Sequence, residues 1–143
     1  MRSQQILCPT DFSETASHAI SYAIEMANFY KVGICLLHVV DKPFGDKYTR
    51  VLAVTPDELI ERMEREAAEK MQQFINSFDV YFPFESRICH GHPVEQILAT
   101  AKNINAGMIV MASHGRTGLA HFLNANTAEE IVNKAHCPVL VVK

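Results

Sequence analysis

The sequence lacks the long apolar run of a membrane protein and the basic block of a nucleic-acid-binding protein. No stretch of its 143 residues approaches the roughly 20 consecutive apolar residues that a membrane helix needs. The opening residues, MRSQQILCPTDF, hold no long apolar segment, so we expect no signal peptide. The net charge is −3, and no lysine- or arginine-rich block is present. We therefore expect neither a membrane nor a nucleic acid as a partner.

The four cysteines are not spaced as in a redox motif. No two cysteines form a CxxC pair, and three of the four lie inside or beside strand-like runs. This pattern predicts reduced cysteines that pack as small apolar side chains, as in a cytosolic protein. They are Cys8, Cys35, Cys89 and Cys137.

Metal-ligand residue types gather once, in Cys89-His90-Gly91-His92. Structural zinc sites need four converging ligands, and this spacing fits no standard pattern. Histidines in a turn are usually solvated. We therefore predict no metal site, although further histidines stand at His114, His121 and His136.

What the sequence does contain is an alternation of strand-like and helix-like segments, in a composition of 48% hydrophobic and 20% charged residues. That composition is ordinary for a globular protein, and the length suits one domain over residues 1–143. The strand-like segments are continuous apolar runs, which indicate a parallel sheet with helices on both faces. The expected strands are 5–9, 34–40, 82–89, 108–112 and 138–142, and the expected helices are 14–30, 56–78, 93–105 and 127–135.

Three helix starts carry capping signals. Ser13 is a natural N-cap for the first helix. Thr55-Pro56-Asp57-Glu58 combines a cap, a proline at the first helical position and a capping-box glutamate. The last helix should start at Asn126 or Thr127, with Glu129-Glu130 as the capping-box partners.

The segment from Met108 to Thr127 is the most informative part of the chain. A buried strand, Met108 to Ala112, is followed by a polar turn from Ser113 to Gly118 and then by a helix. An open α/β sheet presents backbone N–H groups to an anion at such a strand–turn–helix junction. Ligands bind these sheets beyond the carboxyl ends of the strands, so the end of the first strand should flank the same site.

The longest connection, residues 41–54 (DKPFGDKYTRVLAV), has two interpretations. Connections of this length often serve as lids or binding loops. The plainer interpretation, which we favour, is a variable surface excursion.

Several segments taken in order resemble the universal stress protein family over essentially the whole chain. They are Ile6 to Glu14, Leu37-His38-Val39, Gly91-His92-Pro93, Ala112 to Gly118 and Cys137 to Val142. The resemblance implies a single doubly wound α/β fold of the adenine nucleotide alpha hydrolase-like type. Its five-stranded parallel sheet has the order 3-2-1-4-5 and carries helices on both faces. The resemblance also implies a cytoplasmic location and a homodimer.

In ATP-binding members of this family the phosphate loop follows the pattern G-x2-G-x9-G-[ST]. On this chain the four positions are Ala112, Gly115, Ala125 and Asn126. The resemblance therefore implies ATP or another adenine nucleotide as the ligand. Asp11 would hold the adenosine end, the Val39 backbone would contact adenine, and Gly115 with the loop N–H groups would take the phosphates. The expected contact residues are Pro9, Thr10, Asp11, Val39, Met111, Ala112, His114, Gly115, Ala125, Asn126 and Thr127.

The departures from the pattern affect the phosphate end of the site. Ala125 would cost about 1 kcal/mol or more if its backbone were left-handed, and its Cβ would approach the phosphate path. Asn126 can still donate to an anion and cap a helix. We therefore expect weak binding, with the adenosine end held better than the triphosphate. Asp11 also has a structural alternative, an Asx turn that shapes the strand exit.

Two other functions compete with nucleotide binding. An enzyme is not expected, because the chain has no Ser-Gly-Gly loop, no acidic metal pair beside the phosphate loop and no Ser/His/Asp arrangement. Slow ATP hydrolysis or kinase-like activity remains a lesser alternative. The stronger rival is a nucleotide-free interaction module whose loop is merely structural. Both readings expect a homodimer through the last strand, Pro138 to Val142, because a short apolar edge strand needs covering.

Overall fold

The fold was described from a computed structural model, which describes residues 5–40, 55–79, 84–114 and 123–143. Five parallel strands form one sheet in the order β3-β2-β1-β4-β5. This is the fold predicted from the sequence. The elements are β1 (Gln5–Pro9), α1 (Glu14–Tyr30), β2 (Gly33–Val40), α3 (Pro56–Asn76), β3 (Phe84–His90), α4 (Pro93–Asn103), β4 (Met108–Ala112), α5 (Ala125–Lys134) and β5 (Val139–Val142).

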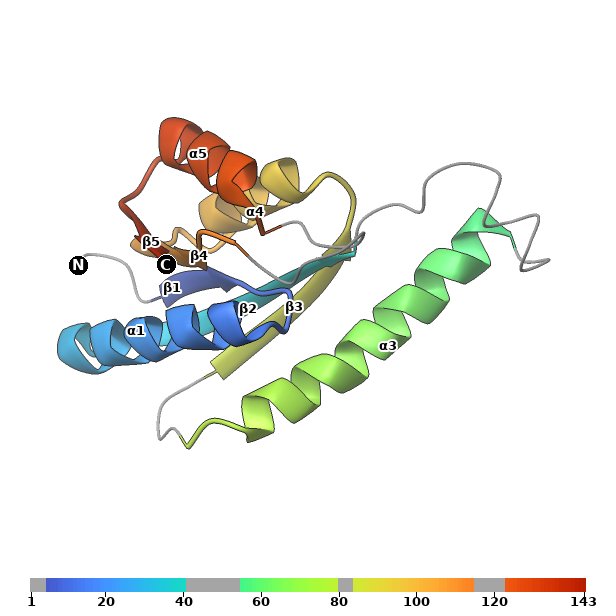
Figure 1. Ribbon diagram of the computed structural model, residues 1–143, viewed down its shortest axis with the longest axis horizontal. Helices are drawn as coiled ribbons and strands as arrows, with labels where there is room; N and C mark the ends of the chain where they lie inside the picture. The colour runs from blue at the N-terminus through green and yellow to red at the C-terminus, as the bar shows by residue number, and fades with distance from the viewer. Residues whose placement is uncertain (1–4, 41–54, 80–83, 115–122) are drawn as a thin grey trace.

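Helices cover both faces of the sheet (Figure 1). α1 and α3 lie on one face, and α4 and α5 lie on the other. Right-handed crossovers produce this arrangement when strands on both sides of β1 are added in parallel. Because all strands run the same way, their carboxyl ends meet at one edge, which is where a ligand site is expected.

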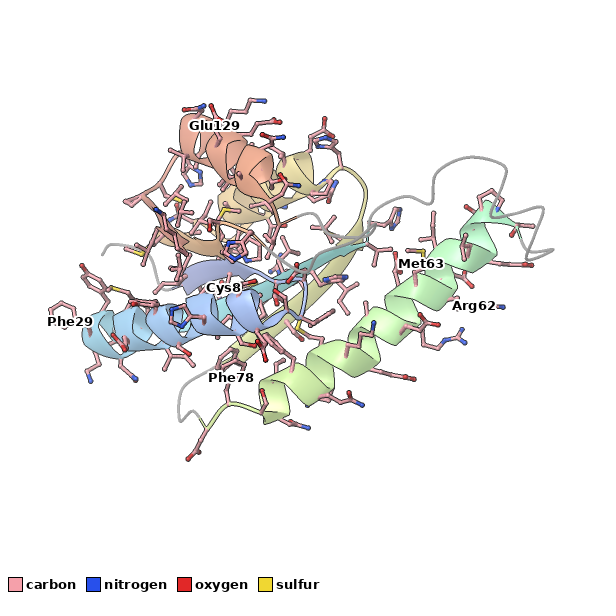
Figure 2. All side chains as sticks on the ribbon, viewed as in Figure 1. Cys8, Phe29, Arg62, Met63, Phe78 and Glu129 are labelled. Carbon is pink, nitrogen blue, oxygen red and sulfur yellow. The ribbon has the colours of Figure 1, made fainter. Side chains whose placement is uncertain are left out.

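The core is built by apolar strands and by an alanine-rich stripe on α1. Ile20 and the alanines of that stripe are at most 1% exposed. Small side chains let α1 approach the sheet closely, so that it covers β1 and β4 together. On α3, Met63 points toward the sheet and Arg62 points away from it (Figure 2), as the amphipathic pattern predicts. The buried alanines of α1 are Ala16, Ala19, Ala23 and Ala27.

Two of the three predicted helix starts are confirmed. The Ser13 hydroxyl accepts a hydrogen bond from the Ala16 N–H at 3.1 Å. Thr55 and Glu58 form a complete capping box, with two reciprocal hydrogen bonds of 3.2 Å. Both helices therefore begin where local chemistry directs them.

The predicted start of the last helix is wrong. α5 begins at Ala125, and its N-cap is Asn124, whose side chain accepts from the Thr127 N–H at 2.9 Å. Asn124 and Asn126 are equally good caps by residue type, so local chemistry does not choose between them. Leu123 and Ala128 are both buried, and their burial anchors the helix with its N-cap two or three residues earlier than a capping box to Glu129-Glu130 would.

Other boundaries differ by one to two residues from the prediction. β2 begins at Gly33, β3 continues to His90, α3 and α4 end at Asn76 and Asn103, and β5 begins at Val139. The connection 41–54 and the first part of the predicted third strand, at 82 and 83, lie outside the described residues.

Candidate functional site

The sheet opens between its two central strands. Pairing of β1 with β4 stops at Leu7↔Ile109. On the outer sides, β1 stays paired with β2 as far as Pro9↔Leu37, and β4 stays paired with β5 as far as Ala112↔Val142. The carboxyl ends of β1 and β4 thus separate at the point where the strand order reverses, the usual ligand position in such folds.

Pro9 explains why the ladder stops. Backbone groups alternate sides along a strand, and the Gln5 carbonyl on the β4 side accepts from the Gly107 N–H at 3.0 Å. Pro9 lies four residues further along β1 and therefore faces β4 as well. It has no N–H to donate, so it cannot continue the pairing. Pro9, which the sequence predicted as a contact residue, thus shapes the site by ending the β1–β4 pairing.

The turn that follows β1 is buried and shaped by its own side chains. Thr10 is 0% and Asp11 3% exposed. Thr10 Oγ1 accepts from the Phe12 N–H, and Asp11 Oδ1 accepts from the Ser13 N–H, each at 3.0 Å. Phe12 has a φ of 64°, which is unusual for a residue with a side chain. The Asx turn considered for Asp11 is therefore present.

The Asx turn is compatible with further partners of Asp11. An ionised carboxylate offers about four acceptor positions, and the Ser13 N–H is one of its partners. The group also lies just before the start of α1, where the helix dipole favours a negative charge. The turn fixes where the carboxylate stands, and a carboxylate is an acceptor suited to a hydroxyl donor.

At the end of β2, Val39 turns its backbone toward β1. The Leu37 carbonyl accepts from the Thr10 N–H at 2.8 Å, and the Val40 carbonyl accepts from the Gly91 N–H on the other side at 3.1 Å. Val39 therefore faces the same way as Leu37. Within the described part of the chain, no backbone hydrogen bond joins Val39 to β1. Val39 is only 1% exposed, and a buried donor and acceptor without a ladder partner is uncommon.

The end of β4 supplies the other wall. Met111 and Ala112 are 0% exposed, as expected for a strand buried on both faces. The Ser113 hydroxyl and His114 Nδ1 are 3.0 Å apart at the surface. Gly115 and the rest of the predicted phosphate loop, residues 115–122, lie outside the described residues.

The first turn of α5 corrects the interpretation of Ala125. Ala125 is the first helical residue, and it is not among the described residues with a positive φ. The cost expected for a left-handed alanine therefore does not arise at this position. The Thr127 N–H is capped by Asn124, whereas no described residue accepts from the N–H of Ala125 or of Asn126. These are the exposed donors that a helix N-terminus offers to an anion.

Sequence reasoning missed Asn124 as the residue that sets this geometry. The available signal was an asparagine directly after a leucine that is buried at the helix entrance. Asn126 is exposed and Thr127 is 8% exposed, so the two predicted site residues differ in their access to a ligand. Asn126 is therefore the second residue of α5 and not its N-cap.

The cysteines and histidines show other roles. All four cysteines are free thiols, and burial raises the pKa of Cys8 and raises that of Cys35 to about 11. Cys8 lies within the sheet (Figure 2). Because a raised pKa leaves little thiolate, both thiols are poorly reactive. Among the described residues no three His, Cys, Asp or Glu side chains converge on a metal position. His90 Nδ1 instead lies 2.7 Å from Glu64 Oε1 on α3.

Comparison with known proteins decides the family. The model of the universal stress protein family matches residues 2–143. This chain is a universal stress protein. It is similar to universal stress protein MJ0577 of Methanocaldococcus jannaschii, with 33% identity over 98% of this chain and 94% of the relative.

Solved structures of other universal stress proteins share the fold. The MJ0577 structure has a TM-score of 0.80 and 33% identity, and the alignment covers 100% of this chain and 97% of that one. A universal stress protein in complex with cAMP has a TM-score of 0.63 and 19% identity, covering 100% and 99%. One from Archaeoglobus fulgidus in complex with dAMP has a TM-score of 0.61 and 20% identity, covering 100% of both chains. In the described part of this universal stress protein, no helix is long and apolar enough to span a membrane.

Proposed function

We propose that this universal stress protein binds an adenine nucleotide where the sheet opens, and that it acts in a cytoplasmic stress response as a binding module rather than an enzyme. The observation that carries the proposal is the point where the sheet opens: in the described part of the chain the Val39 N–H and C=O make no hydrogen bond to β1, and the turn that follows β1 holds the buried Asp11 carboxylate. Two structural neighbours are described in complex with cAMP and dAMP, which supports adenosine monophosphates as the ligand class.

The base fits the end of β2. The Val39 N–H is a donor and its C=O an acceptor, both on the side where β1 has turned away. The Watson–Crick edge of adenine presents a ring-nitrogen acceptor next to an amino donor, so it complements one backbone N–H and C=O pair. Val39 is 1% exposed, so hydrogen bonds from its backbone to a base would form in a low dielectric.

The ribose and the phosphate have separate partners. The Asp11 carboxylate can accept from a ribose hydroxyl while it holds the Asx turn. The N–H groups of Ala125 and Asn126 at the start of α5 can donate to a phosphate, as can the Asn126 amide. These backbone donors are the same whether the residue is glycine or alanine. Loss of the family glycine at this position therefore leaves the anion site its main-chain donors.

The test is titration calorimetry of the purified protein with AMP, ATP and GMP, preceded by heat extraction to release any nucleotide that copurifies. We expect an adenine nucleotide to bind and GMP to bind more weakly, because guanine presents a ring N–H where adenine presents an acceptor. Absence of binding to both adenine nucleotides, with no nucleotide in the heat extract, would favour the nucleotide-free interaction module instead.

We also propose a homodimer through the last strand, Pro138 to Val142. β5 is the edge of the sheet beyond β4, and Val139, Leu140 and Val141 remain partly exposed. An apolar, uncharged edge invites pairing with another strand. The opposite edge differs, because β3 carries the exposed ion pair of Arg87 and Glu85, with Nε and Oε1 2.8 Å apart.

A pair of lysine substitutions tests this interface. Val141→Lys on β5 should yield a monomer, or poorly soluble protein, in light scattering. Ser86→Lys on the exposed β3 edge is the matched control and should leave the dimer intact. A monomeric wild type, or a Val141→Lys variant that stays dimeric, would contradict the proposal.

A further inference from the structure

His38, a half-buried residue near the end of β2, bonds to the β1 backbone at the point where the β1–β2 ladder ends. The Thr10 N–H donates to the Leu37 carbonyl at 2.8 Å. In a regular parallel ladder the next bond would run from the Val39 N–H to the Thr10 carbonyl. That carbonyl is instead 2.8 Å from His38 Nδ1. A carbonyl oxygen can only accept, so Nδ1 carries the hydrogen and the imidazole takes the place of the next main-chain donor.

Thr10 diverts the following rung in the same way. The regular ladder would continue with a bond from the Phe12 N–H to the Val39 carbonyl. The Phe12 N–H donates to Thr10 Oγ1 at 3.0 Å instead. Two side chains thus intercept two successive rungs, one to the N–H and one to the C=O of Val39. Together they leave both the donor and the acceptor of Val39 without a partner on β1.

The ring of Phe12 holds His38 in this position. The two rings stack with centroids 4.5 Å apart and an interplanar angle of 28°. The edge of Phe12 also meets Phe74 of α3, at 5.7 Å and 77°. Phe12 keeps a φ of 64°, a strained conformation for an aromatic residue, which the surrounding packing must maintain. Backbone strain of this kind clusters at active sites and ligand sites.

We propose that His38 is a positioning residue that keeps the Val39 N–H available for the base of a bound adenine nucleotide. This inference rests on the proposed function, because the ligand is the one assigned to that site. His38 itself need not touch the nucleotide. Its effect is to occupy the carbonyl of Thr10, a residue that is 0% exposed. Without His38, that buried carbonyl would accept from the Val39 N–H.

Two substitutions separate the hydrogen bond from the packing. His38→Phe keeps an aromatic ring against Phe12 but removes the donor. His38→Asn loses the ring but keeps an N–H donor close to the position of Nδ1. We expect His38→Phe to weaken AMP binding about ten-fold or more, because a competing intramolecular bond must be broken. His38→Asn should bind AMP within about three-fold of the wild type, since the donor is restored.

A second readout reports the ladder directly and requires no ligand. Scalar coupling across a hydrogen bond, measured by NMR between the Val39 nitrogen and the Thr10 carbonyl carbon, should be absent in the wild type and present in His38→Phe. His18→Phe, on the exposed face of α1, is the matched control and should change neither coupling nor affinity. Thermal melts establish that each variant is folded. Thr10→Val is a second, independent variant, and it should restore the other rung to the Val39 carbonyl.

The outcomes distinguish this inference from the proposed function. Coupling between Val39 and Thr10 in the wild type, or AMP binding by folded His38→Phe equal to that of the wild type, would overturn the role of His38. A wild type that binds no adenine nucleotide would overturn the proposed function. In that case the coupling measurement alone still decides whether His38 ends the ladder.

Discussion

Replacing Asp11 by asparagine separates the structural role of this carboxylate from its role in binding. Asp11 Oδ1 accepts from the buried Ser13 N–H at 3.0 Å, and an asparagine oxygen can accept the same bond. We therefore expect Asp11→Asn to change the free energy of unfolding by less than about 1 kcal/mol. Asp11→Ala removes the acceptor and leaves the Ser13 N–H without it, which should cost about 1–3 kcal/mol in a denaturant titration.

The binding effect of the same substitution has a different size. A charge-assisted hydrogen bond from a ribose hydroxyl to Asp11 is worth about 1.5–3 kcal/mol, so AMP affinity should fall roughly ten- to a hundred-fold in Asp11→Asn. Adenine alone, which has no ribose, should bind the wild type and Asp11→Asn equally well in calorimetry. If Asp11→Asn binds AMP as tightly as the wild type, Asp11 serves only the turn and our assignment is refuted.

Three further predictions follow from the described residues. Ala125→Gly combined with Asn126→Ser should raise ATP affinity at least several-fold in calorimetry and leave AMP affinity nearly unchanged. The reason is removal of a Cβ near the phosphate path, since the helical Ala125 has no strain to relieve. Equal gains for both ligands would contradict this. Asn124→Ala should lower the free energy of unfolding, measured in urea, by about 1 kcal/mol, because the α5 cap is lost. Asn126→Ala should change it by only a few tenths of a kcal/mol. Equal losses would indicate that Asn126 is the cap. Cys8 and Cys35 should resist a thiol reagent in native protein at pH 8, because burial raises their pKa values and the thiolate is the reactive form; labelling as fast as in urea would contradict this.

Much of the fold was accessible from the sequence because the deciding signals are local. The bounds of β1 and β4 are the predicted ones, since each is a continuous apolar run that stops at a proline or at a polar turn. Ser13 and Thr55 begin their helices as predicted because cap chemistry acts within three residues. The family resemblance then supplied the strand order, which periodicity alone leaves open.

The details of the site required the tertiary structure, because they depend on partners far apart in the chain. Val39 was named from the resemblance, but its missing hydrogen bonds to β1 follow from Thr10, which lies 29 residues earlier. The Thr10 carbonyl pairs with the His38 ring, and the Thr10 hydroxyl accepts from the Phe12 N–H. The start of α5 was mispredicted because two asparagines compete as caps, and the burial of Leu123 decides between them. Composition and spacing predicted a ligand-binding edge, whereas strand register and burial decided which backbone groups that edge presents.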